Sequence, residues 1–403
     1  MSSVITKPTH HVPIHVLGIS QIIAYGLMFY VFATLKGPIS ERVAVDPSLF
    51  LYAVSGALVL QALLAPKIGA WVDYYGALKV MRVGLLLGAL GMFIMAFAHS
   101  FWMVCAALLP LGLGYAMATY EVAFSAAVQM DEKKSRRNIS LITFYGGVAS
   151  SVTWLSVAPL VAFAGLTMAC VAIGVILLLA GFVVGSRAPK DFGHAHQSNE
   201  EQEPFRWSKL LPGERRAMVA LAASGTLEYL IFASTTLLWI TYFTDLHQDA
   251  AVGVMLASIY GPFQVVGRVI EMVFGKHLDA RLTALMAALM IPMALILVQF
   301  PSMELSILAM ILFGMGHGVL TVSFGFVTNL YFRAEIYGRA KGVIGSPRAM
   351  GAAFGPSIGG LLYALGPDQF IYVMVATSLI SSAVLAFLLL LAPTNEVHQK
   401  QSA

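Results

Sequence analysis

The chain has 403 residues, of which 59% are hydrophobic and only 11% are charged, with a formal net charge of +4. Soluble domains carry about 25% charged residues, so this composition excludes an ordinary globular protein. The apolar stretches are about 20 residues long, which is the length a helix needs to cross a bilayer, and they lack the short alternating pattern of a membrane barrel. We therefore predict an all-α membrane protein.

Twelve apolar segments follow one another along the chain. We place them near residues 12–35, 48–70, 79–99, 101–126, 139–163, 165–186, 216–242, 250–274, 281–300, 303–328, 342–366 and 368–392. The residues before Val12 are polar and lack the apolar core and cleavage site of a removable signal peptide. The first segment is therefore expected to stay in the membrane.

One long polar stretch, from about residue 187 to 215, divides these segments into two groups of six. Its low hydrophobicity predicts a solvated linker. We expect an N-terminal six-helix bundle at 1–186, a linker at 187–215, a C-terminal six-helix bundle at 216–392 and a tail at 393–403.

Lysine and arginine are distributed unequally between the two sets of connections. The connections expected on one side of the membrane carry most of these residues, near 79–82, 133–137, 187–216, 276–281 and 333–341. The connections on the other side hold only Lys36 and Arg42. Connections rich in Lys and Arg stay on the cytoplasmic side. This pattern predicts cytoplasmic termini, a cytoplasmic linker and a bacterial inner membrane location.

Several functional classes find no support in the chain. Cys105 and Cys170 fall inside apolar segments, where they are expected to pack rather than to form a disulfide. The chain contains neither a metal-ligand spacing nor a phosphate-binding glycine loop, so we expect no metal, no cofactor and no ATP hydrolysis. We find no catalytic triad and no basic domain, so neither an enzyme nor a nucleic-acid binding protein is expected.

The two halves repeat one local pattern. Gly112-Leu-Gly114-Tyr115 in the fourth segment corresponds to Gly314-Met-Gly316-His317 in the tenth, half a chain later. Tyr25 and Tyr229 occupy similar places in the first and seventh segments. A duplicated bundle of apolar helices is typical of a secondary transporter, which carries its substrate along a path between the halves.

A motif after the second segment supports this interpretation. Gly69, Asp73 and Gly76, followed by Arg82, fit much of the pattern G-x-x-x-D-[RK]-x-G-[RK], which resembles the major facilitator superfamily. The resemblance covers nearly the whole chain. It implies two pseudo-symmetric six-helix bundles, a monomer, and a gate in which Asp73 caps the next helix or holds a basic residue. Tyr74 and Ala77 depart from the pattern, so Lys79 or Arg82 would have to serve as the basic partner.

A second pattern lies in the eleventh segment. It consists of Gly342, Gly351, Gly355-Pro356 and Gly359-Gly360, and it resembles the antiporter motif of the superfamily. In exporters that motif usually lies in the fifth segment. The alternative is a smooth groove for close helix packing, with the proline bending the helix.

Ionisable residues inside membrane segments are costly and usually functional. Glu228 lies near the midplane of the seventh segment and is our first candidate for a proton-coupling carboxylate; a structural hydrogen bond is the alternative. His317 is either a second titrating group or a packing residue. Glu121, towards the cytoplasmic end of the fourth segment, is either a proton carrier or one side of an inner-gate ion pair.

Other candidates would line the substrate cavity. Arg268 either binds an anion or forms a local salt bridge with Glu271 on the same helix face. Arg348 either faces the cavity or extends towards the membrane surface. Further residues in segments that line the family's central cavity are Gln21, Tyr25, Tyr115 and Tyr229.

Together these features predict a secondary active transporter that works by alternating access in the lipid bilayer. Its expected ligands are protons and a small-molecule substrate. We expect export of a small amphiphilic or toxic compound. The alternative is proton-coupled uptake of a small organic anion such as a monocarboxylate, which Arg268 and Arg348 would favour if they face the cavity.

Overall fold

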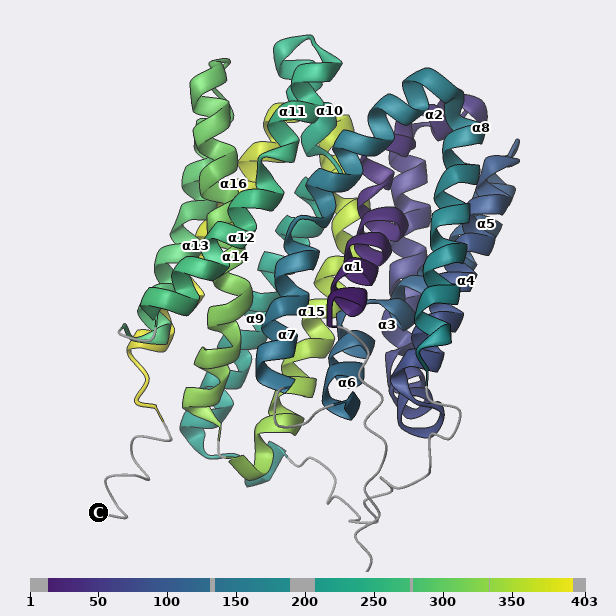
Figure 1. Cartoon of the computed structure of the whole chain (residues 1–403). Helices are drawn as coiled ribbons and strands as arrows, with labels where there is room; N and C mark the ends of the chain where they lie inside the picture. The colour runs from purple at the N-terminus through teal and green to yellow at the C-terminus, as the bar shows by residue number, and fades with distance from the viewer. Residues whose placement is uncertain (1–13, 131–134, 189–206, 276–277, 333, 394–403) are drawn as a thin grey trace, which may run out of the picture.

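The structure, a computed structural model, describes residues 14–130, 135–188, 207–275, 278–332 and 334–393 (Figure 1). Within those ranges the regular structure is entirely helical, as predicted. The first half contains α1 (Ile14–Tyr25), α2 (Phe32–Arg42), α3 (Pro47–Tyr75), α4 (Ala77–Ala96), α5 (Phe101–Ala118), α6 (Tyr120–Met130), α7 (Ser135–Gly147) and α8 (Ala149–Ser186). The second half contains α9 (Pro212–Thr236), α10 (Trp239–His247), α11 (Ala250–Ser258), α12 (Tyr260–Phe274), α13 (Ala280–Leu297), α14 (Met303–Tyr331), α15 (Ala334–Leu365) and α16 (Pro367–Leu389).

The helices are long and apolar enough to cross a membrane. Ten helical stretches in the described residues meet that criterion, and one of them, Arg137–Ser186, is 50 residues long. This stretch reverses at Gly165, whose φ of 75° only glycine adopts readily, so it holds two spans. With α15, which is 32 residues long, the described residues supply twelve segments of sufficient length.

Helix packing joins neighbouring elements into two groups (Figure 1). In the first half α4 packs against α5 and α8, and α1 packs against α7 and α8. In the second half α9 packs against α15 and α16, while α14 packs against α12 and α13. The groups meet where α3 contacts α15, where α8 contacts α11 and α12, and where α7 contacts α12.

Several membrane helices are interrupted near their middle, and at two of these breaks a side chain from another helix satisfies a backbone carbonyl. A π-helical turn at Gly26–Tyr30 separates α1 from α2, and Trp154 Nε1 donates a hydrogen bond to the Tyr30 carbonyl at 3.0 Å. The α5–α6 junction is extended at Thr119, and Gln21 Nε2 donates to the neighbouring Ala118 carbonyl at 3.0 Å. Lipid cannot supply such partners, so these side chains make the breaks tolerable.

The glycine pattern of α15 lies along its contact with α9. A Cβ on Gly351 would stand 2.3 Å from the Thr226 carbonyl oxygen, and one on Gly355 would stand 2.6 Å from the Ala233 Cβ. Gly342, at the other end of the pattern, has no atom within 4 Å of that position. The central glycines therefore allow two helix backbones to approach closely.

The two halves are joined on the face opposite the α3–α4 turn, which is the upper side of Figure 1. Lys36 of α2 is only 5% exposed, and its ammonium group donates to the carbonyl of Leu237, the C-cap residue of α9, at 3.2 Å. A cation at a helix C-terminus is favourable because the helix dipole is negative there. The Ser357 amide of α15 also donates to Ser55 Oγ of α3 at 2.9 Å.

We predict that Gly351→Ala destabilises the protein, whereas Gly342→Ala does not. The new methyl group at residue 351 meets a backbone carbonyl, and overpacking of this kind costs about 1–3 kcal/mol. Thermal unfolding in detergent should show a lower melting temperature for Gly351→Ala and a wild-type or slightly higher one for Gly342→Ala. Equal melting temperatures for the two variants would rule out close packing as the role of these glycines.

We also predict that Lys36→Met loosens the contact between the halves. Methionine keeps the side-chain length but removes the donor to the end of α9. Spin labels at the exposed Glu41 and Ala250, with Cys105 and Cys170 replaced by Ala, report the separation of α2 and α11 by electron paramagnetic resonance. The distance distribution should broaden towards longer distances in Lys36→Met and stay unchanged in the control Lys67→Met, which alters an exposed lysine of α3. An unchanged distribution in Lys36→Met would show that the hydrogen bond from Lys36 to Leu237 does not hold the two halves together.

Candidate functional site

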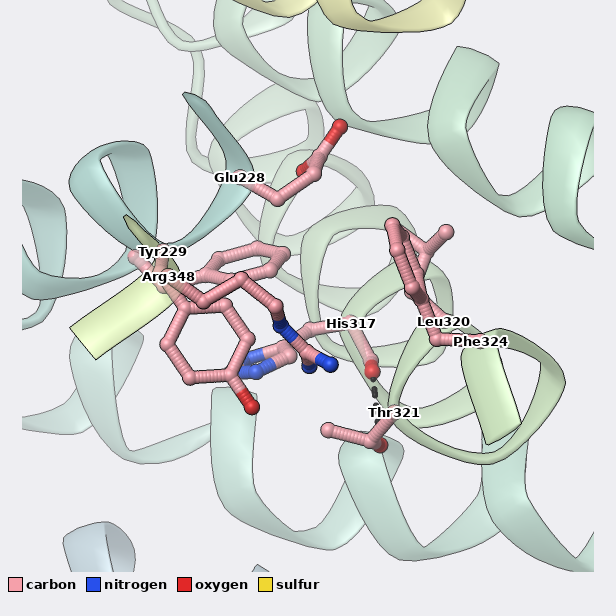
Figure 2. A pocket seen from close by; sticks show the side chains of 8 residues that line it. Glu228, Tyr229, His317, Leu320, Thr321, Phe324 and Arg348 are labelled. Carbon is pink, nitrogen blue, oxygen red and sulfur yellow. Dashed lines mark hydrogen bonds between the residues drawn. The ribbon is translucent and has the colours of Figure 1, made fainter. Parts of the chain in front are cut away.

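A pocket lies among three helices of the second half (Figure 2). Helix α9 contributes Glu228, Tyr229 and Phe232, α14 contributes His317, Leu320, Thr321 and Phe324, and α15 contributes Arg348. Four of the predicted candidates therefore line one space: Glu228, Tyr229, His317 and Arg348. Its remaining walls are mostly apolar or aromatic, as in ligand pockets generally.

Arg348 lies between two aromatic rings of this pocket. Its guanidinium carbon is 4.5 Å from the centre of the Tyr229 ring and 4.8 Å from that of Phe324. The aliphatic part of the side chain passes over Gly225, where a Cβ would stand 2.7 Å from Arg348 Cδ. Arg348 Nε is buried and has no hydrogen-bond partner among the described residues. The rings thus hold the cation by cation–π contact while its polar edge remains available.

Glu228 is the acidic residue of the pocket, but it does not pair with Arg348. Its side chain is 2% exposed, and neither carboxylate oxygen has a hydrogen-bond partner in the described part of the chain. Figure 2 shows the carboxylate pointing away from the arginine. The Ser381 hydroxyl of α16 lies nearby, but it is engaged with Ser224 Oγ at 2.9 Å.

His317 is held on three sides. Its ring stacks on Phe232 with 3.5 Å between the ring centres and an angle of 9° between the planes. Its Nδ1 atom contacts the Tyr260 hydroxyl and lies 3.0 Å from Gln264 Nε2. Tyr260 in turn stacks with Trp154 of α8, so the histidine is connected to the first half of the chain.

Arg268 reaches the other half of the protein. It is 3% exposed, and its Nη1 donates to the carbonyl of Thr143 in α7, while its Nε donates to Thr321 Oγ1 at 3.3 Å. The Tyr120 hydroxyl donates to the same Thr143 carbonyl at 3.4 Å. Arg268 therefore lies beside a tyrosine from the first half.

Glu271 does not pair with Arg268, although the two share a helix face. The Glu271 carboxylate accepts hydrogen bonds from Ser323 Oγ at 2.8 Å and Thr283 Oγ1 at 3.2 Å. Each residue thus has its own partners in place of the local salt bridge that we considered from the sequence.

Tyr120, the neighbour of Arg268, belongs to a cluster of tyrosines from the first half. The Tyr25 ring is 4.5 Å from Tyr120, 5.4 Å from Tyr115 and 6.4 Å from Tyr30, measured between ring centres. Tyr120 was not selected from the sequence, because it follows directly after the break at Thr119 and its direction depends on that break. The Gln21 amide nitrogen does not contact this cluster, because it donates a hydrogen bond to the Ala118 carbonyl.

The predicted gate residues lie apart from this pocket. Asp73 is exposed near the end of α3, and Gly76, with φ of 89°, forms the turn into α4. The Arg82 guanidinium lies 6.0 Å from the Phe182 ring of α8. Gln129 of α6, which the sequence did not single out, accepts from the Ala77 amide at 2.9 Å and so ties the α3–α4 turn to α6.

Glu121 is exposed in the first turn of α6 and does not line the pocket. Its immediate neighbour Tyr120 faces the tyrosine cluster instead. The structure therefore brings together only part of the predicted set of proton-coupling candidates.

The family model of the Major Facilitator Superfamily matches residues 17–346 and 221–403 of the chain. The chain belongs to this superfamily. It is therefore a multi-pass membrane transporter of small molecules and not an enzyme. Among curated proteins, none matches its sequence.

Solved structures with this superfamily fold resemble the chain at low sequence identity. The nucleoside transporter NupG aligns with a TM-score of 0.70 and 16% identity, covering 93% of this chain and 98% of that chain. A bacterial homologue of the human lysosomal transporter Spinster, in an inward-facing and occupied conformation, aligns with a TM-score of 0.70 and 13% identity, covering 96% and 98%. These likenesses establish the fold.

Proposed function

We propose that this superfamily member is a proton-coupled secondary transporter for a small organic anion with an apolar or aromatic body. The observation that carries the proposal is Arg348, whose guanidinium lies between Tyr229 and Phe324 with no carboxylate of the described residues against it. A cation held in an apolar pocket without a counter-ion is a binding site for an anion, because an incoming carboxylate supplies the missing charge.

The surroundings of Arg348 favour the same class of substrate. Phe232, Leu320 and Phe324 offer an apolar surface for the body of the ligand. Arg268 adds a second buried cation near the boundary between the halves, beside the hydroxyl of Tyr120. A neutral amphiphile would use the aromatic surface but would leave the Arg348 guanidinium without an anionic partner.

Glu228 is the proposed proton carrier. A buried carboxylate without a hydrogen-bond partner is costly when ionised, so it is expected to gain and lose a proton as the cavity opens and closes. Because Glu228 points away from Arg348, the proton and the anion have separate places in one pocket. This separation allows both to be bound at once.

Export of a small amphiphilic or toxic compound is the second candidate, supported by the aromatic lining of the pocket. The glycine pattern of α15 supports antiport only weakly, because Gly351 and Gly355 are in packing contact with α9. We further propose a monomer in a bacterial inner membrane with both termini cytoplasmic, on the basis of the Lys and Arg distribution. The sign of the proton flux distinguishes symport from antiport.

The first test concerns Glu228→Gln, which keeps the shape of the side chain but cannot carry a proton. Inverted membrane vesicles with an imposed pH gradient are challenged with small monocarboxylates, aromatic carboxylates and neutral aromatic compounds. We expect wild-type vesicles to show a proton flux triggered by carboxylates, and the variant to lose it while still exchanging radiolabelled substrate. Glu121→Gln serves as the matched control. A flux that survives in Glu228→Gln would remove this residue from the coupling mechanism.

The second test concerns Arg348→Gln. A hydrogen bond to a charged group contributes about 1.5–3 kcal/mol, so the affinity for a transported carboxylate should fall by roughly tenfold to a hundredfold. Arg348→Lys keeps the charge but loses the planar stack, and an intermediate affinity is expected. Binding is measured by calorimetry on purified protein. If Arg348→Gln bound carboxylates as tightly as the wild type, or if the wild type bound only neutral amphiphiles, the anion proposal would be wrong.

A further inference from the structure

The hydrogen bonds around His317 constrain where its ring carries a proton. Gln264 Nε2 lies 3.0 Å from His317 Nδ1 and 3.0 Å from the Tyr260 hydroxyl oxygen. The Tyr260 hydroxyl contacts the same Nδ1 atom. The Tyr260 hydroxyl, Gln264 Nε2 and His317 Nδ1 thus form a triangle in which each atom contacts the other two.

With the Gln264 amide nitrogen directed at the imidazole, one arrangement of hydrogens makes all three contacts hydrogen bonds. An amide nitrogen is a donor and never an acceptor, so Gln264 Nε2 must donate to Nδ1. With its oxygen accepting from Gln264, the Tyr260 hydroxyl directs its own hydrogen to Nδ1 as well. A proton on Nδ1 would face these donors, so Nδ1 carries a lone pair and the ring proton resides on Nε2.

The Nε2 atom has no hydrogen-bond partner among the described residues, and His317 lines the pocket that holds Arg348. Figure 2 shows the imidazole next to the arginine side chain. Stacking on Phe232 fixes the ring plane, with 3.5 Å between ring centres. A donor with a fixed direction is therefore available beside the guanidinium group.

Charged and titratable groups from three helices surround the ring. They are Arg268 and Tyr260 from α12, Arg348 from α15, and Glu228 and Tyr229 from α9. Two of these groups are cations, and they oppose a further positive charge on the imidazole. The acid, Glu228, directs its carboxylate away from Arg348 and has no hydrogen bond to the ring.

We infer that His317 is a neutral, fixed hydrogen-bond donor to the substrate anion and not a proton carrier, with Tyr260 and Gln264 as its positioning residues. One carboxylate oxygen of the substrate would bind Arg348 and the other would accept from His317 Nε2–H. The part of the inference that concerns the substrate rests on the proposed function. The protonation state does not, since it is argued from the hydrogen bonds and the cations around the ring and not from any substrate.

The protonation state can be measured without any substrate. The full chain is labelled with ¹⁵N-histidine and placed in nanodiscs, and the His317 resonances are identified among the 10 histidines by their loss in His317→Gln. We expect a ring protonated on Nε2 only, from about pH 5.5 to 8, the range in which an ordinary histidine titrates. A doubly protonated ring near pH 6, or a proton on Nδ1, would overturn the inference. Gln264→Leu should release the ring to titrate, whereas the control Gln61→Leu on α3 should not.

The donor role is then tested by binding. Aromatic and aliphatic monocarboxylates and their methyl esters are titrated by calorimetry. We expect His317→Leu to weaken carboxylate binding about tenfold, and His317→Gln, whose amide supplies an N–H, to restore most of the loss. If Arg348→Gln weakens binding but both His317 variants bind as the wild type does, the donor role is wrong and the anion proposal stands. If no carboxylate binds the wild type, the anion proposal fails, and the resonances still decide the protonation state.

Discussion

The requirement that every backbone polar group in a membrane find a partner within the protein shapes this structure. Several membrane helices break within their spans, and at three of the breaks a side chain from another helix bonds a nearby carbonyl. Gln21 bonds Ala118, Trp154 bonds Tyr30, and Lys36 bonds Leu237. The breaks thereby become places where helices are tied together. They also set the directions of the residues that follow them, such as Tyr120.

A second feature of the structure is that four charged residues inside the second half do not form ion pairs with one another. Arg268, Glu271, Glu228 and Arg348 are buried or partly buried, yet none forms an ion pair with another in the described structure. Arg268 and Glu271 are satisfied by hydroxyls and a carbonyl, whereas Glu228 and Arg348 keep unpartnered atoms. Satisfied groups hold helices together, and unsatisfied ones are available to a ligand or a proton. We therefore assign a structural role to the hydrogen-bonded charged groups and a candidate functional role to those with unpartnered atoms.

How far the site was predictable depended on the helix in which each residue lies. The sequence identifies Glu228 and Arg348 as candidate site residues because ionisable residues are rare in apolar segments, and both line the pocket. Glu121 met the same criterion but is exposed at the start of α6, because the break at Thr119 reorients the chain. Gln264 plays its part only through the three-way contact with Tyr260 and His317. No spacing in the chain indicates that contact.

The sequence by itself determined the class of protein, the positions of the apolar spans and the asymmetry of charge between the two sets of connections. Hydrophobicity, span length and Lys and Arg counts are local sums that do not depend on how helices pack. Only the tertiary structure decided that Arg348 stacks between Tyr229 and Phe324, that Glu228 turns away from it, and that Lys36 reaches the end of α9. Those outcomes depend on which helix faces approach each other, because side chains from α2, α9, α14 and α15 meet only after the spans have packed.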